Sequence, residues 1–243
     1  KYGPDSMIGA KGTISGLWYP NRSEVPGLFS SSAQAGEFFY TRRLAGRNYI
    51  GATYQIQNLE AHPSPLSTKT QSMLFFYTFK PQTNLSLSFF TGPEHSNTSG
   101  GGTVPLRNWS PAAGASIGWQ GSYTSLAASY SHRTTEGGGL GVAVRSSSVD
   151  ASARWQLART FTVGLGANYS INSVVNSSPG DTGGHTVSGG LSLERMLGQN
   201  IRAQLGYTRL HQSYVNFFVL SNIPDRNYVW VSFSYQFQRA LGR

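Results

Sequence analysis

The sequence predicts an all-β fold, namely an antiparallel, up-and-down β-barrel of about twelve strands forming one domain over residues 1–243. Three observations predict this fold. Apolar and polar residues alternate in segment after segment, which is the period of a strand with one apolar face. The connections between these segments are short and long in turn. Charged residues make up only 12% of the chain, against roughly 25% in an average soluble domain.

The N-terminal half contains six alternating segments, and the pattern is weakest over 1–34. Short turns at 45–47 and 81–83 contrast with long loops at 20–33 and 92–111, which are rich in Pro, Gly, Ser and Asn. The stretch 62–65 contains two Pro residues, which cannot donate to a strand ladder, so it ends a strand. The predicted strands are 6–19, 35–44, 48–57, 72–80, 84–91 and 113–119.

The C-terminal half repeats this organisation with six more segments. Its clearest hairpin pairs 149–157 with 161–169, where apolar residues occupy every second position on both sides of a short turn. Further short turns fall at 120–122, 158–159 and 197–199, and long loops at 133–140, 172–184 and 212–225. The predicted strands are 123–132, 149–157, 161–169, 187–193, 201–207 and 228–237.

The last segment alternates Val229, Val231, Phe233, Tyr235 and Phe237 with residues that are mostly small and hydroxyl-bearing. An aromatic-rich terminal strand that ends in Phe resembles the C-terminal strand of bacterial outer-membrane β-barrel proteins. This chain departs from that pattern because further residues follow Phe237. The resemblance is one of pattern over essentially the whole chain, in the porin-like class. It implies an outer-membrane location and leaves the activity open.

The polar faces of the segments also favour a membrane barrel. They consist of Ser, Thr, Gly, Gln and Asn and contain almost no Lys, whereas the outer face of a soluble protein is normally rich in Lys and Glu. Short periplasmic turns, long extracellular loops and an even strand number are typical of bacterial barrels. Aromatic residues near the short turns fit an interfacial girdle: Phe79, Trp119, Trp155, Phe161 and Phe237. A soluble all-β binding module is the alternative.

The sequence was also compared with the patterns of membrane helices and secretory leaders. No stretch approaches the roughly 18–20 apolar residues of a membrane helix. The chain shows no secretory leader at its start, so we expect either the mature protein or a trimmed fragment.

Six charged residues are expected to point into the lumen: Glu37, Arg43, Asp150, Arg154, Glu194 and Arg202. Asp150 and Arg154 share a strand face but lie about 13 Å apart along it. Glu194 and Arg202 flank a turn and are expected to face each other across the hairpin. One interpretation is a charged constriction that selects solutes, as rings of Arg do for anions. The other is a salt-bridge network that fills a narrow barrel.

The loop around Tyr214, Phe217 and Phe218 is unusually apolar for an extracellular loop. It could fold back as a constriction or dock onto a partner. Alternatively, it is the upper hairpin of two strands that extend beyond the membrane.

No pattern in the chain indicates catalysis, a metal or a cofactor. The five histidines fall in predicted loops or at strand ends, without the HxH or HExxH spacing of metal sites. Among barrel enzymes, the outer-membrane phospholipase type uses Ser and His for catalysis, and the omptin protease type uses Asp and His. In this chain the one acid next to a His in sequence is Glu94, beside His95, and this pair lies in a predicted loop. The net charge of +9 is dispersed along the chain, which argues against nucleic-acid binding.

The sequence therefore predicts a bacterial outer-membrane barrel that forms a passive channel for small solutes, with a preference for anions. The alternative is a non-conducting barrel that serves as an envelope anchor or as a partner-binding scaffold through its extracellular loops. Expected partners are outer-membrane lipid and lipopolysaccharide, together with a second copy of the chain or another envelope protein.

Overall fold

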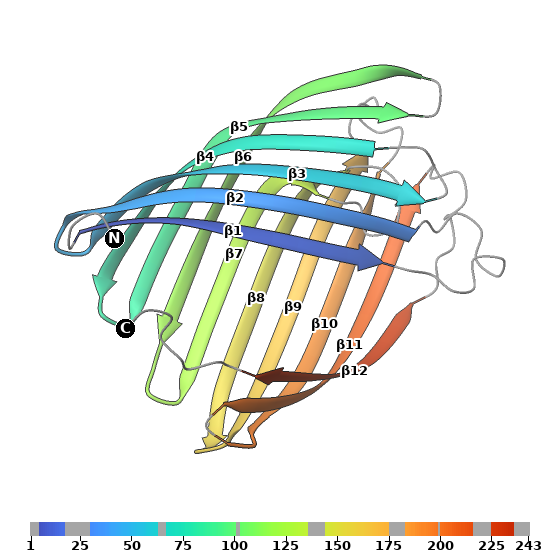
Figure 1. Ribbon diagram of the computed structural model, residues 1–243. Helices are drawn as coiled ribbons and strands as arrows, with labels where there is room; N and C mark the ends of the chain where they lie inside the picture. Colours follow the sequence, from blue (N-terminus) through green and yellow to red (C-terminus); the bar gives the residue numbers. More distant parts are fainter. Residues whose placement is uncertain are drawn as a thin grey trace.

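The computed structural model describes residues 5–17, 30–62, 67–100, 103–135, 144–174, 183–198, 200–215 and 225–235. They form one sheet of 12 strands that follow each other in sequence order (Figure 1). Every strand is antiparallel to its neighbours. The predicted all-β, up-and-down architecture is confirmed. Among these residues no helix is long and apolar enough to cross a membrane.

The first six strands are β1 (Ser6–Leu17), β2 (Ser30–Ala45), β3 (Asn48–His62), β4 (Ser67–Gln82), β5 (Leu85–Gly100) and β6 (Thr103–Gln120). The last six are β7 (Thr124–Thr135), β8 (Val144–Ala158), β9 (Phe161–Val174), β10 (Gly183–Met196), β11 (Ile201–Val215) and β12 (Arg226–Tyr235). Figure 1 shows the sheet curling around a concave side, which we call the lumen, with the tight turns at one end and the long connections at the other. Within the described residues β1 and β12 are not paired, so they form the two edges of the sheet.

Most strands are longer than predicted, chiefly at the end of the long connections. The largest error concerns 92–111, which was expected to be a loop but continues β5 and β6 up to the pair Gly100 and Thr103. The prediction failed because this stretch lacks apolar alternation and contains Pro93 and Pro111. The two prolines lie opposite each other. Pairing of β6 with β7 begins only at Ala113, so Pro111 occupies a free edge where its missing N–H costs no ladder bond.

The two faces of the sheet are reversed relative to a soluble protein. The strand register places nearly all large exposed apolar side chains on the outer face, including Phe233 (72% exposed) and Phe38 (63% exposed). The predicted girdle residues Phe79, Trp119 and Trp155 are exposed on this face, whereas Phe237 lies outside the described residues. The buried residues have the inward register except Ser30 and Thr134, and most of them are polar. An apolar outside and a polar inside is the arrangement of a transmembrane barrel.

Inward-facing aromatic rings lie close over glycines on the neighbouring strand. Trp230 on β12 covers its cross-strand partner Gly206 on β11 so closely that an added Cβ would be 2.2 Å from the indole ring. Phe76 likewise covers Gly51, where the distance would be 2.3 Å. Glycine therefore lets bulky rings fit against the lumen wall without projecting across it.

Candidate functional site

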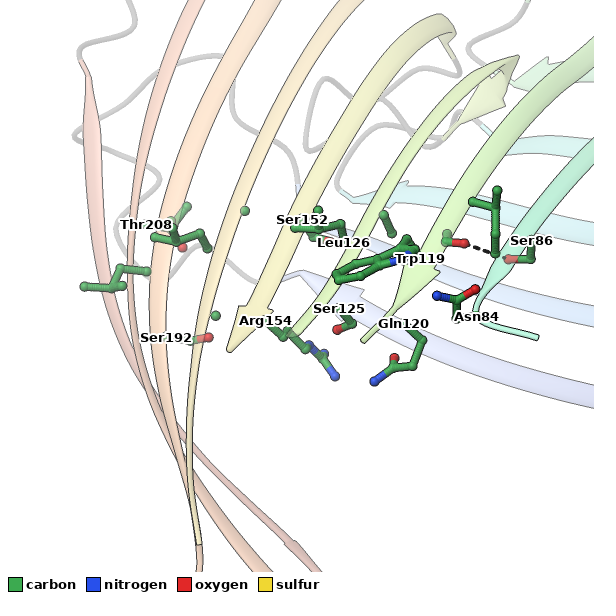
Figure 2. Close-up of a pocket in the computed structure, with 18 of the residues that line it drawn as sticks. Asn84, Ser86, Trp119, Gln120, Ser125, Leu126, Ser152, Arg154, Ser192 and Thr208 are labelled. Atoms are coloured by element: carbon green, nitrogen blue, oxygen red, sulfur yellow. Dashed lines mark hydrogen bonds between the residues drawn. The ribbon is translucent and has the colours of Figure 1, made fainter. Parts of the chain in front are cut away.

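A large cavity lies on the lumen side, toward the tight-turn end of the sheet. It has a volume of about 630 Å³ and is bordered by residues from β4 through β12. Figure 2 shows side chains from different strands gathered around it, among them Gln120, Ser125 and Arg154, which extend into the same space. Further polar lining comes from the turn between β4 and β5 and from inward positions on β4, β5, β8, β10 and β11: Lys80, Thr83, Asn84, Ser86, Ser152, Ser192 and Thr208.

Among the described residues, this cavity, which we call the turn-side cavity, is lined by charged groups of positive sign alone. Lys80 and Arg154 both border it, and its described lining contains no carboxylate. The Lys80 ammonium lies 5.2 Å from the centre of the Tyr49 ring, a distance at which the ring attracts the cation. The cavity therefore offers small hydroxyl and amide groups around two positive charges.

Of the predicted lumen residues, Arg154 borders the turn-side cavity and Asp150 a neighbouring cavity of about 350 Å³. Asp150 does not pair with Arg154. Its Oδ1 accepts a hydrogen bond from Asn168 Nδ2 at 2.7 Å, because Asn168 is its cross-strand partner on β9.

Glu194 and Arg202 do meet across their hairpin, at 3.8 Å between Oε1 and Nη1. They are diagonal neighbours and not direct partners, since Glu194 lies opposite Gln204. With 51% of the Arg202 side chain exposed, this pair adds little stability.

Arg43 has a local role at the turn between β2 and β3. Its Nε donates a hydrogen bond to the carbonyl of Gly46 at 2.7 Å, and Gly46 has a φ of 48° that favours glycine. Glu37 borders a small cavity of about 190 Å³ farther along β2. Tyr214 lies in β11, opposite Gly184, which agrees with the alternative of a longer strand and not with a loop. Phe217 and Phe218 lie outside the described residues.

A row of polar residues crosses the inner face at one level and was not predicted from the sequence. The register aligns one inward residue from each of six consecutive strands, and we call this row the polar rung: Lys11, Glu37, Gln55, Ser72, Glu94 and Ser110. It was missed because Glu94 and Ser110 were assigned to a loop. Extending the hairpin register of β4 and β5 past Thr91 would have found it.

Strand β7 is hydrogen bonded to this rung from another part of the wall. Arg133 Nη2 donates to Gln55 Oε1 at 2.9 Å, and the backbone N–H of Thr134 donates to Glu94 Oε1 at 2.8 Å. Glu94 is 1% exposed and Thr68, on the same inner face, is 3% exposed. The inner face is thus densely packed toward the long connections and hollow toward the tight turns.

The histidines lie within strands and not in loops, and their register turns them outward. His211 Nδ1 is 2.5 Å from Asp225 Oδ1, and Arg209 Nη2 donates to Asp225 Oδ2 at 2.6 Å. The hydrogen bond from Arg209, and then that from His211, lower the pKa of the Asp225 carboxyl. The rings of His185 and His211 are 6.2 Å apart, whereas His132 bonds to Ser147. No group of three or more potential metal ligands occurs in the described part of the chain.

The sequence matches no protein-family model. It also matches no curated protein. Its fold, however, is similar to solved structures. The monoaromatic hydrocarbon channel TodX gives a TM-score of 0.58 at 10% identity, covering 98% of this chain and 82% of TodX. A FadL homologue from Pseudomonas aeruginosa gives 0.55 at 12% identity, covering 95% and 73%.

The FrpB iron transporter from Neisseria meningitidis gives a TM-score of 0.56 at 10% identity, covering 86% of this chain and 41% of FrpB. This chain therefore spans about two fifths of the FrpB chain. Identities this low establish the fold and nothing finer. The fold is that of a bacterial outer-membrane β-barrel, and the apolar outer face of the sheet suits a lipid environment.

Proposed function

We propose that the protein is a passive channel for small solutes that prefers anions. The observation that carries this proposal is the turn-side cavity, where Lys80 and Arg154 are accompanied by hydroxyl and amide groups and by no carboxylate among the described lining residues. Positive charge in a confined lumen raises the local concentration of anions and lowers that of cations. The names of two similar structures, a hydrocarbon channel and an iron transporter, are consistent with a transport role.

A non-conducting barrel is the second candidate, and the polar rung favours it. The hydrogen bonds from β7 to Gln55 and Glu94 join separate parts of the inner wall. If these bonds persist in the membrane, the lumen is narrowed at that level. The chain would then act as an anchor or scaffold in the envelope.

Neither candidate involves catalysis. We infer that the outward-facing histidines serve at the lipid interface, where Arg209, His211 and Asp225 form a charged patch beside phosphorylated headgroups such as those of lipopolysaccharide. Extended Arg and His side chains at the membrane surface suit such contacts.

Conductance in planar bilayers tests the proposal. Purified protein should give steady steps whose reversal potential in a salt gradient shows anion preference. The double variant Lys80→Met with Arg154→Gln should lose most of that preference while keeping the steps. The control is Arg159→Gln, an exposed charge at a turn. The absence of any steps from folded protein would leave the non-conducting barrel.

A further inference from the structure

The small cavity beside Glu37 combines charges of both signs. Its volume is about 190 Å³, well below the roughly 300–1,000 Å³ of pockets for drug-sized ligands. It lies where β1, β2 and β3 meet the Arg133 side chain of β7. Its polar lining consists of Lys11, Thr13, Glu37, Gln55, Gln57 and Arg133, so it sits on the polar rung.

The charged groups of this cavity are not neutralised by one another. Lys11 and Glu37 are direct cross-strand partners, a position in which opposite charges commonly attract. Nevertheless, neither makes an ion pair with any described residue. Arg133 is fixed by its bond to Gln55, which uses only one of the five donors of its guanidinium group. The site therefore has two cations and one carboxylate available in a small volume.

We propose that this cavity binds a small zwitterion, with its carboxylate between Lys11 and Arg133 and its ammonium group against Glu37. A simple anion would place negative charge beside Glu37, and a simple cation would meet both Lys11 and Arg133. Only a solute that carries both charges complements all three groups, and like charges facing each other in a binding site reduce affinity strongly.

The side-chain amides support the same ligand class. Gln55 is held in place by Arg133, and Gln57 borders the cavity one inward position farther along β3. Amides can both donate to a carboxylate and accept from an ammonium group. Together with the Thr13 hydroxyl, they can replace part of the hydration that a small zwitterion loses on entering.

This inference rests on the proposed channel only for the route by which the solute arrives, since binding itself requires no conduction. The lumen would then select solutes by charge at two positions. The turn-side cavity attracts negative charge, whereas the cavity beside Glu37 demands a positive group as well.

Isothermal titration calorimetry on the whole protein in detergent micelles tests the site with β-alanine, propionate and propylamine. These probes share a three-carbon chain and differ in which charges they carry. We expect β-alanine to bind about tenfold or more tightly than either of the others, because each lost charge-assisted hydrogen bond weakens binding by about that factor. Equal binding of propionate and β-alanine, or no binding of β-alanine, would overturn the proposal.

Variants assign the effect to this cavity. Lys11→Met and Glu37→Gln should each weaken β-alanine binding about tenfold, and Glu37→Gln should leave propionate binding unchanged or improved. Arg159→Gln, an exposed charge at a turn outside both cavities, is the control and should bind β-alanine normally. Gln55→Ala removes the hydrogen bond that positions Arg133 but keeps the positive charge of Arg133. This variant therefore shows how far β-alanine binding depends on the position of the Arg133 side chain and not on its charge alone.

Conductance of the same preparations separates this proposal from the channel. If β-alanine binds but no current steps appear, the channel fails and the binding site stands. If anion-preferring steps appear but β-alanine does not bind, the channel stands and the binding site fails.

Discussion

The Thr134 backbone N–H on β7 donates a 2.8 Å hydrogen bond to Glu94 Oε1 on β5, although β6 lies between these strands. The bond exists because the pairing of β6 with β7 begins only at Ala113 and His132, and Pro111, two residues before Ala113 in β6, has no N–H to extend it. The end of β7 thus lacks a backbone partner on this side, and a buried carboxylate takes its place.

Replacing Glu94 with Ala should destabilise the barrel by about 1–3 kcal/mol, because a buried N–H loses its acceptor. Glu94→Gln keeps an oxygen in place and should lose less. Urea unfolding in lipid vesicles, followed by Trp fluorescence, gives the free energies. Glu194→Ala is the control, since its salt bridge is half-exposed and its loss should cost little. Equal stabilities of Glu94→Ala and Glu194→Ala would show that the Glu94 bond does not hold β5 to β7.

A glycine on the lumen wall allows a second test. An added methyl at Gly206 would lie 2.2 Å from the Trp230 ring, so Gly206→Ala should cost about 1–3 kcal/mol as the indole is displaced. Gly166 also faces inward, but nothing lies within 4 Å of its added Cβ. Gly166→Ala is therefore the matched control and should be neutral or slightly stabilising, since Ala has less chain entropy to lose. If both variants unfold alike in the same urea titration, the ring does not rest on Gly206.

The sequence predicted the fold well where side chains alternate strictly. In β8 and β9, Val149 to Leu157 and Phe161 to Tyr169 face lipid at every second position, so the pattern alone locates both strands. The prediction failed at the strand ends toward the long connections, because outward-facing side chains need not be apolar there. Residues 92–100 carry Ser, Asn, Thr and Gly on both faces, so no periodicity marks them as β5.

The same lack of alternation explains why most of the candidate site was not predicted. Of the polar rung, the prediction included Glu37 alone as a functional residue, since Glu94 and Ser110 fell in a stretch assigned to a loop. Arg133, which contacts the rung, also fell in a predicted loop. Arg154 borders the turn-side cavity, but the positive charge of that cavity also depends on Lys80, and the residues that face Lys80 across the lumen cannot be found from a single strand. The contact from Arg133 to Gln55 joins β7 to β3, and local periodicity contains no information on such distant pairs.

Asp225 should make stability depend on pH. Arg209 and then His211 lower its pKa in the folded protein, so it binds protons less readily folded than unfolded. A carboxyl with a depressed pKa stabilises the fold above its ordinary value of about 3.9 and loses this contribution as the pH falls below that value. The unfolding midpoint of the wild type should therefore exceed that of Asp225→Asn at pH 7, and the difference should shrink as the pH falls below about 3.9 toward the lowered pKa of the folded state. The group is exposed, so the difference should be small and should shrink in high salt. A gap of constant size from pH 7 to pH 3 would contradict the role of Asp225.

The two edge strands, β1 and β12, are expected to pair with each other in the membrane. β1 and β12 carry unpaired backbone N–H and C=O groups among the described residues, and such groups cannot remain unpaired in lipid, where each costs several kcal/mol. β1 runs away from the tight-turn end and β12 runs toward it, so the two edges are antiparallel and can pair with each other as in a closed barrel. The chain contains no cysteine, so introduced thiols report cleanly. Thr13→Cys combined with Ser232→Cys or with Ser234→Cys samples two registers on the inward face. In native membranes, oxidation should form an intramolecular disulfide in one of these variants, seen as faster migration of the unfolded, unreduced protein on gels. Dimers in place of this product would mean that the edges pair between two copies of the chain.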